Sequence, residues 1–292
     1  MSYPRPQISL LVPFRASASS PHRTRLWSWL RTYWQYELPD AEVVIGTSTA
    51  AAFSKTEALN DAAKKAHGRI FVLLDSDAYL RGDTILRAAR AIEESARRGQ
   101  NRWFIPYRRL YRLVEASTEL ILNSDPKWPV RLPSPPSPDD VESMTTATYG
   151  HHFGAMVQIM PREAFESVGG MDRRFEGWGG EDVAFVRAVD TLYGKHKTLN
   201  AEVLHLWHPS IGFNASNKMW EGQERPGMNG HLASRYHRAT GDPIKMRALV
   251  EEARPPAPPP EEPQPEAPLA TPRQWLKRVA SWWRDAVWKL LV

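Results

Sequence analysis

Two pairs of carboxylates stand where they could bind a metal ion or move a proton. Asp75-Ser76-Asp77 directly follows an apolar run, and Glu181-Asp182 directly follows Gly177-Trp178-Gly179-Gly180. Hard divalent cations take carboxylate oxygens together with phosphate oxygens of a substrate, and two carboxylates one residue apart can address a single ion. A carboxylate placed beside a substrate can also take the proton of an attacking hydroxyl. The first pair therefore predicts a metal site, and the second pair a general base.

Each pair also has a simpler explanation. Acidic loops after strands are common, so Asp75-Ser76-Asp77 alone is a weak signal. Glu181 and Asp182 precede a helix expected at residues 183–192, where the partial positive charge of the helix N-terminus favours an acid. A helix start does not require three glycines and a tryptophan directly in front of it, however. The ring of Trp178 beside a carboxylate suits the apolar face of a sugar, which favours a binding site.

Two histidines could complete the metal site. His205 lies at the end of a strand expected at residues 198–206, and His208 follows it before Pro209. A single histidine at a strand end is more often structural than a ligand, but neutral imidazole is a common metal ligand, and here there are two. We favour His205 because of its place at the strand terminus, with His208 as the alternative.

Strands alternate with helices along the first hundred residues. Apolar runs predict strands, and apolar side chains at helical spacing predict helices. The expected strands are residues 8–12, 41–45, 69–74 and 103–105, and the expected helices are residues 23–36, 55–66 and 84–98. This alternation predicts an α/β fold with a mostly parallel sheet flanked by helices. Ligands bind beyond the carboxyl ends of such strands, so Pro13-Phe14-Arg15 and Asp75-Ser76-Asp77 should face one crevice.

The middle of the chain lacks this periodicity. Residues 123–149 are rich in proline, and a loop this long inside a domain is usually a lid or a binding loop. Lys127-Trp128 within it could meet a phosphate or a sugar. Beyond this loop we expect strands at residues 153–160 and 198–206, and helices at residues 161–168, 183–192, 231–239 and 243–252.

The C-terminal part has a different composition. Residues 1–252 are expected to form the catalytic domain, and residues 253–272 a proline-rich, extended linker. Residues 273–292 predict an amphipathic helix, with tryptophans on one face and lysine and arginine on the other. Such a helix is typical of an anchor at an anionic membrane surface, and equally of a helix that docks on this protein or on a partner.

Composition limits the cellular setting. The 292 residues carry a net charge of +5, and the basic residues are scattered, so we expect no nucleic-acid partner. The sequence has no cysteine, which excludes disulfides and thiolate metal sites and fits a reducing compartment. There is no signal-peptide pattern and no apolar run long enough to span a bilayer. These features predict a cytoplasmic protein that is peripheral at the inner face of the membrane if residues 273–292 form an anchor.

The motifs in this order resemble those of a known family. Pro13-Phe14-Arg15, then Phe53 to Asn60, then Asp75-Ser76-Asp77 look like successive motifs of GT-A fold (Rossmann-like) glycosyltransferases of the family 2 type. Gly169-Gly170-Met171-Asp172, Phe175 and Gly177 to Asp182 are similar to the C-terminal motif shared by β-1,4-galactosyltransferases and polypeptide N-acetylgalactosaminyltransferases. The resemblance covers roughly residues 8 to 208, and the last motif is the most specific.

The resemblance implies a role for each matching residue. Asp75, Asp77 and His205, with His208 as the alternative to His205, would hold Mn²⁺ or Mg²⁺ on the diphosphate. Glu181 would contact the sugar, and Asp182 would be the base for the acceptor hydroxyl. The residues implied to bind the nucleotide sugar are Pro13, Phe14, Arg15, Lys55, Asn60, Asp75, Ser76, Gly154, Trp178, Gly179 and Gly180.

Two departures from the family pattern bear on the stereochemistry. The galactosyltransferases continue with further acids where this chain has Val183, and the retaining N-acetylgalactosaminyl enzymes typically have asparagine where Asp182 stands. Asp182 therefore favours an inverting reaction.

The expected function is a metal-dependent glycosyltransferase. It would move a hexose or N-acetylhexosamine from a nucleotide sugar, with UDP as the expected nucleotide, to a hydroxyl acceptor on a glycan, a glycolipid or a protein. One alternative is a nucleotidyltransferase, but residues 13–22 lack the glycine that its phosphate loop would need. The other alternative is a non-catalytic carbohydrate-binding or assembly protein with the same fold.

Overall fold

The computed structural model describes residues 7–17, 20–50, 53–146, 156–176, 179–209, 213–214, 219–220 and 227–254. Several sequence predictions lie outside these residues. They are the predicted site residues Gly154 and Trp178, and the C-terminal linker and helix beyond Arg254.

The larger sheet has six strands in the order β2-β1-β3-β8-β5-β9. Its strands are β1 (Ile8–Pro13), β2 (Glu42–Gly46), β3 (Ile70–Leu74), β5 (Phe104–Ile105), β8 (Val157–Pro161) and β9 (Lys197–Thr198). β1 runs parallel to both β2 and β3, whereas β8 runs antiparallel to both β3 and β5. β5 and β9 are parallel to each other. The α/β class is thus confirmed, and this sheet is mixed because β8 runs opposite to the other five strands.

A smaller sheet lies beside the site and is also mixed, in the order β4-β10-β6-β7. Its strands are β4 (Ala78–Tyr79), β6 (Arg109–Leu113), β7 (Val141–Thr146) and β10 (Glu202–His205). A separate antiparallel pair consists of β11 (Phe213–Asn214) and β12 (Met219–Trp220).

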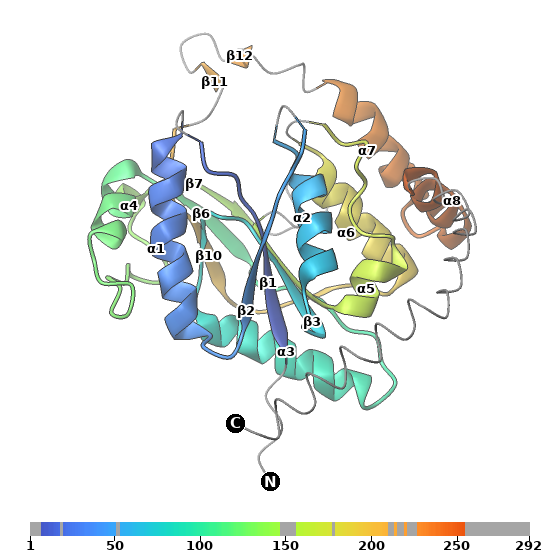
Figure 1. Cartoon of the computed structure of the whole chain (residues 1–292), viewed down its shortest axis with the longest axis horizontal. Helices are drawn as coiled ribbons and strands as arrows, with labels where there is room; N and C mark the ends of the chain where they lie inside the picture. The colour runs from blue at the N-terminus through green and yellow to red at the C-terminus, as the bar shows by residue number, and fades with distance from the viewer. Residues whose placement is uncertain are drawn as a thin grey trace, which may run out of the picture. The chain divides into compact units, whose positions relative to one another are not determined.

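Helices lie on both sides of the strands (Figure 1). Helices α1 and α4 are on one side, and α2, α5 and α6 are on the other. The helices are α1 (Pro21–Glu37), α2 (Lys55–Lys65), α3 (Gly82–Ala96), α4 (Glu115–Leu122), α5 (Arg162–Ser167), α6 (Glu181–Leu192), α7 (Gly227–Ala239) and α8 (Pro243–Ala253). None of these described helices is long and apolar enough to cross a membrane.

The sequence prediction missed structure in the middle of the chain. β6 and α4 were not expected, and part of the supposed loop at residues 123–149 is a short 3-10 turn (Pro138–Asp140) followed by β7. β7 lies at the end of the strand order and pairs with β6, and its side chains are mostly exposed. An exposed edge strand shows no apolar alternation, so periodicity could not reveal it.

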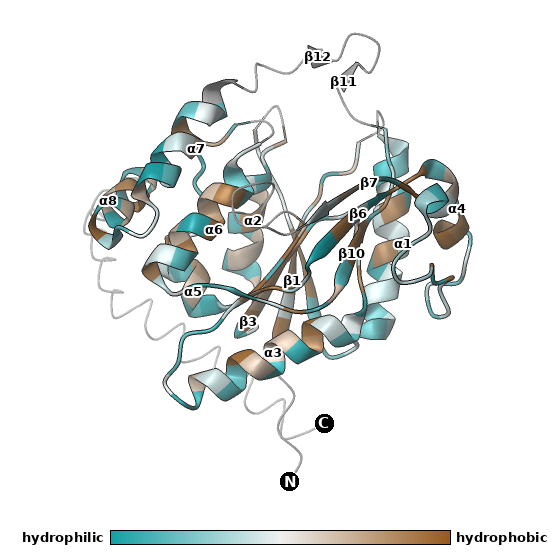
Figure 2. Cartoon of the chain, turned by 180° about the vertical axis from the view of Figure 1, so that it is seen from behind, coloured by the Kyte–Doolittle hydropathy of each residue, from teal (hydrophilic) through white to brown (hydrophobic). Residues whose placement is uncertain are grey.

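The core explains why the first elements were predictable. Every residue of β1 and β3 is buried, as the unbroken apolar runs indicated. Helix α1 buries Leu26, Trp27, Trp29, Leu30, Tyr33 and Trp34. Figure 2 shows these strands as the most hydrophobic part of the chain, enclosed by helices with mixed faces.

Candidate functional site

Strand pairing brings Asp77 to both histidines. Asp77 directly precedes β4, and β4 pairs antiparallel with β10 so that Ala78 lies opposite His205. The backbone N–H of Leu206 donates to the carbonyl of Asp77 at 3.0 Å. Asp77, His205 and His208 consequently offer ligand atoms that all lie within 4.8 Å of one another. This is an Asp/His group suited to a metal ion.

Charge and burial prepare this group for a cation. Burial alone would raise the pKa of Asp77, but His205, His208 and Arg23 outweigh it and hold that pKa well below its ordinary value. Burial lowers the pKa of His205 although Asp77 opposes the shift. An ionised carboxylate beside a neutral imidazole is the protonation state that metal binding requires.

The donor set indicates which ion fits. One carboxylate oxygen and two imidazole nitrogens are available from Asp77, His205 and His208. Mg²⁺ prefers an all-oxygen shell, whereas imidazole suits transition-metal ions. Of the two expected cofactors, this set therefore favours Mn²⁺ over Mg²⁺.

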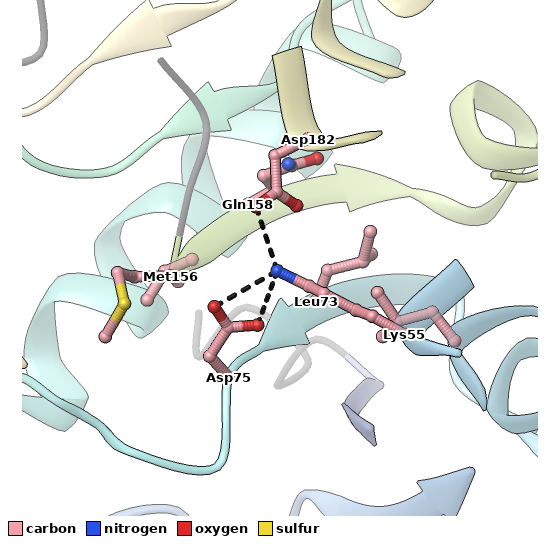
Figure 3. A pocket seen from close by; sticks show the side chains of 8 residues that line it. Lys55, Leu73, Asp75, Met156, Gln158 and Asp182 are labelled. Atoms are coloured by element: carbon pink, nitrogen blue, oxygen red, sulfur yellow. Dashed lines mark hydrogen bonds and ion pairs between the residues drawn. The ribbon is translucent and has the colours of Figure 1, made fainter. Parts of the chain in front are cut away.

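A second charged cluster surrounds Lys55 (Figure 3). Its Nζ lies 2.8 Å from Asp75 Oδ1 and donates to Asp182 Oδ2 at 2.9 Å. These residues come from three places: Lys55 opens α2, Asp75 follows β3, and Asp182 lies in the first turn of α6. Lys55, Asp75 and Asp182 line a small pocket together with Leu59, Leu73, Met156, Val157 and Gln158. Asp75 thus faces Lys55, while Asp77 faces the histidines.

Burial makes Asp182 a weaker acid than an ordinary aspartate. Burial raises the pKa of Asp182 to about 7; Lys55 opposes this shift, and Glu181 and Asp75 add to it. Burial works against the charge of Lys55, but Asp182 and Asp75 raise its pKa well above the ordinary value. An acid whose pKa lies near the working pH is suited to exchange a proton with a substrate.

The glycines in front of α6 separate the roles of its two acids. Gly180 is the residue before the helix and has a φ of 89°, in the left-handed region that favours glycine. The backbone N–H of Gly179 donates to Glu181 Oε2 at 2.9 Å. Glu181 therefore folds back on its own loop, whereas Asp182 points to Lys55 and the pocket.

Asn60, on α2, is hydrogen-bonded to the segment around Gly170 and Met171 that precedes α6. Its side-chain amide donates to the Met171 carbonyl at 2.8 Å and accepts from the Met171 N–H at 2.9 Å. A Cβ atom at Gly170 would lie 2.4 Å from Asn60 Oδ1, so this approach requires glycine. Asn60 thereby fixes the segment that leads to α6.

The other predicted nucleotide residues lie around the end of β1. Pro13 is the last residue of β1 and is buried, and Ser76 is buried between the two aspartates. The Phe14 ring packs against Trp27 with 6.0 Å between centroids. Arg15 is exposed, donates to the Ala50 carbonyl at 2.9 Å, and lies over the Phe53 ring.

Lys127 and Trp128 are not near this site. Lys127 Nζ lies 4.4 Å from the ring centroid of Tyr36, close to the end of α1. Arg23, in the first turn of the same helix, contacts the Asp/His group. Thirteen residues of helix separate Tyr36 from Arg23, which corresponds to about 20 Å along the axis.

Sequence reasoning missed several residues of the site. Arg23 gave no signal because it looks like any basic residue on a helix. Tyr107 is buried; burial raises its pKa, and Asp182 and Asp75 raise it further. Met156 has a φ of 74°, although it is not a glycine, and its carbonyl accepts from the Asp75 N–H at 2.9 Å. Backbone strain of this kind often occurs at functional sites.

Comparison with known proteins supports the resemblance. Residues 143–206, which include α6 and β10, match the model of a family described as the N-terminal domain of galactosyltransferase. The resemblance inferred from the motifs is thus confirmed for residues 143–206, which are similar to that galactosyltransferase family. A search of curated proteins finds no match.

The solved structures that match this chain share little sequence with it. The catalytic domain of Drosophila β1,4-galactosyltransferase 7, in complex with xylobiose, is 14% identical, with 79% of this chain and 80% of that chain covered and a TM-score of 0.43. GalNAc-T7 with UDP, GalNAc and Mn²⁺ is 13% identical, with 85% and 54% covered and a TM-score of 0.44, so the chain spans about half the length of that protein. A mannosyltransferase from Pyrobaculum calidifontis, in complex with GDP-Man and Mn²⁺, is 15% identical, with 85% and 74% covered and a TM-score of 0.43.

Proposed function

We propose that this chain is a metal-dependent glycosyltransferase. It transfers a hexose or N-acetylhexosamine from a nucleotide sugar, with UDP as the expected nucleotide, to a hydroxyl acceptor. The observation behind the proposal is that Asp75-Ser76-Asp77 joins an Asp/His group to a partly buried candidate base, Asp182. The match of residues 143–206 to a galactosyltransferase family supports this reading of the geometry.

The metal site consists of Asp77, His205 and His208. Mn²⁺ fits this set of ligand atoms better than Mg²⁺. Asp75 becomes part of the nucleotide-sugar site if Lys55 releases its carboxylate. When bound, the ion supplies a Lewis acid that neutralises the negative charge of the departing nucleoside diphosphate. His208 is oriented for this role, since its Nδ1–H donates to the Pro209 carbonyl at 3.0 Å and leaves Nε2 toward Asp77.

Asp182 is the base that takes the proton of the acceptor hydroxyl. It lies in the pocket and has a pKa of about 7, raised by burial, so it can accept a proton near neutral pH. A direct attack by the activated hydroxyl inverts the configuration of the sugar. Glu181 contacts the sugar from the loop that it shares with Gly179 and Gly180.

The nucleotide lies against the end of β1. Pro13, Phe14 and Arg15 bind it there, and Asn60 supports the pocket through its bonds to Met171. Lys55 lies between Asp75 and Asp182, where its ammonium group meets the sugar diphosphate once the donor is bound.

The acceptor is a hydroxyl on a glycan, a glycolipid or a protein.

Residues 273–292 anchor the chain at an anionic membrane surface, and deleting residues 254–292 tests this anchor. Full-length and truncated proteins are compared for co-sedimentation with liposomes that contain anionic lipid. Equal binding by both would rule the anchor out.

The proposed function is tested with purified protein and a set of nucleotide sugars. UDP-galactose and UDP-N-acetylgalactosamine come first, and UDP release is measured with and without Mn²⁺. We expect Mn²⁺-dependent release that Asp77→Ala abolishes and that Asp83→Asn, at an exposed position on α3, leaves unchanged. Metal-dependent UDP binding with no transfer to any acceptor would favour a non-catalytic binding protein instead.

A further inference from the structure

Arg23 reaches into the Asp/His group from a different element. It lies in the first turn of α1, and its Nη2 is 3.5 Å from Asp77 Oδ2 and 3.0 Å from His208 Nε2. The two atoms that it contacts belong to the set expected to hold the metal ion. A guanidinium group therefore occupies the side of Asp77 from which a cation would approach.

The position of Arg23 is unfavourable for the helix itself. The N-terminus of a helix carries partial positive charge, so a basic side chain in the first turn is destabilising. No acidic residue in the first turn of α1 compensates for it, and Ser20 at the N-cap makes no side-chain hydrogen bond. Asp77, on a different part of the fold, is the acid that balances this charge.

The guanidinium group also keeps one donor unused. Arg23 Nε is buried and has no hydrogen-bond partner among the described residues. A buried donor without an acceptor costs free energy. Arginine presents a planar fork of donors that matches phosphate oxygens, so an incoming diphosphate would satisfy this group.

The contacts of His208 show that Arg23 and a metal ion compete. His208 Nε2 lies 3.0 Å from Arg23 Nη2 and 3.2 Å from Asp77 Oδ2, so Arg23 contacts both of these ligand atoms. With the proton of a neutral His208 on Nδ1, a metal ion would take the Nε2 lone pair and the Asp77 carboxylate. Two positive groups at the same two ligand atoms repel each other, so binding of the ion requires Arg23 to move away.

We propose that Arg23 neutralises Asp77 while the metal is absent and moves to the diphosphate of the donor when the metal binds. This inference depends on the proposed function, because it assumes a metal at Asp77 and a nucleotide diphosphate beside it. It makes the first turn of α1 part of the donor site. Donor binding then supplies an acceptor for the Nε donor, so that metal and diphosphate bind with positive coupling.

The test measures two affinities that should change in opposite directions. Calorimetry with the full chain gives the affinity for Mn²⁺ alone, and then for UDP at saturating Mn²⁺. In Arg23→Ala we expect Mn²⁺ alone to bind about tenfold more tightly, and UDP with Mn²⁺ to bind about tenfold more weakly. Arg23→Lys keeps the charge but loses the fork, so it should resemble the wild type for Mn²⁺ and Arg23→Ala for UDP.

Two controls separate this role from a structural one. Arg25→Ala removes a basic residue from the same helix, where Arg25 pairs with Glu119 away from the site, and it should change neither affinity. Arg23→Gln keeps most of the side-chain volume and should reproduce the opposite changes if Arg23→Ala unfolds. Unchanged or weaker Mn²⁺ binding in folded Arg23→Ala or Arg23→Gln overturns this inference alone. If neither the wild type nor the Arg23 variants bind Mn²⁺, both the inference and the proposed function fail.

Discussion

Asp77 is buried and Asp182 is partly buried, each beside a basic side chain, yet their pKa values move in opposite directions. Burial favours the protonated form of each. At Asp77, three groups outweigh burial and the pKa falls well below its ordinary value. At Asp182, one lysine does not, and the pKa rises to about 7.

The difference arises from how many acids share each cation. Lys55 is divided between Asp75 and Asp182, and Glu181 adds a third negative charge nearby. Asp77 has Arg23 and two imidazoles, which together lower its pKa. The first environment favours an acid that can exchange protons near neutral pH, and the second an ionised carboxylate suited to hold a metal ion. The same residue type therefore supplies two different chemistries in one site.

Replacing the base should have the largest effect. We expect Asp182→Asn to lower the rate of sugar transfer about 10³-fold, within the range typical of general-base catalysis. Affinity for UDP with Mn²⁺ should stay within about twofold, because Asp182 does not belong to the Asp/His group. Initial rates and calorimetry on the same preparation check both statements. Transfer at the native rate would show that another group takes the proton.

Replacing Asp77, the proposed metal ligand, should chiefly weaken the binding of Mn²⁺. We expect Asp77→Asn to weaken Mn²⁺ binding by about 100-fold. The loss of a group that only orients a metal ligand can already cost up to about 100-fold in metal affinity. Unlike Asp182→Asn, Asp77→Asn should lose activity that very high Mn²⁺ concentrations partly restore. A Mn²⁺ titration of the transfer rate for both variants measures this contrast, and equal Mn²⁺ dependence of the two would remove the distinction between the clusters.

The sequence predicted the acids of both clusters, and also Lys55, His205 and His208, but not Arg23 or Tyr107. Asp75, Asp77, Glu181 and Asp182 were predictable because each follows a recognisable local pattern, a strand end or a glycine-rich helix start. Arg23 and Tyr107 reach the site only through tertiary packing, which no local pattern records. For the same reason the antiparallel direction of β8 was not predictable, since an apolar run reveals a buried strand and not its orientation.

Lys55 should control the pH at which transfer becomes fast. Transfer requires ionised Asp182, so kcat/KM should rise with pH through about 7, the pKa to which burial raises Asp182. Lys55 lowers the pKa of Asp182, so Lys55→Met should raise that pKa further and move the rise of kcat/KM to higher pH. Lys65→Met is the matched control, because Lys65 lies on the same helix and pairs with Asp61. A pH profile that Lys55→Met leaves in place would exclude Asp182 as the titrating group.

The smallest effect concerns the glycine that aims Asp182. Gly180 has a φ of 89°, and an added Cβ would lie 3.2 Å from Ala233 Cβ and 3.3 Å from the Phe175 ring. We expect Gly180→Ala to cost about 1–3 kcal/mol of unfolding free energy through backbone strain. The shift at the start of α6 should also lower the transfer rate by a few-fold.

Gly99 separates strain from positioning. Its φ of 67° is also left-handed, but no atom lies within 4 Å of an added Cβ, and it belongs to the turn after α3. Gly99→Ala should therefore destabilise the protein by about 1 kcal/mol or more and leave transfer and Mn²⁺ binding unchanged. Urea unfolding and initial rates on both variants make the comparison. Gly180→Ala could lower stability but keep the native rate and pH profile. The backbone before α6 would then not determine how Asp182 meets Lys55, and the pKa of Asp182 would depend on burial and neighbouring charges alone.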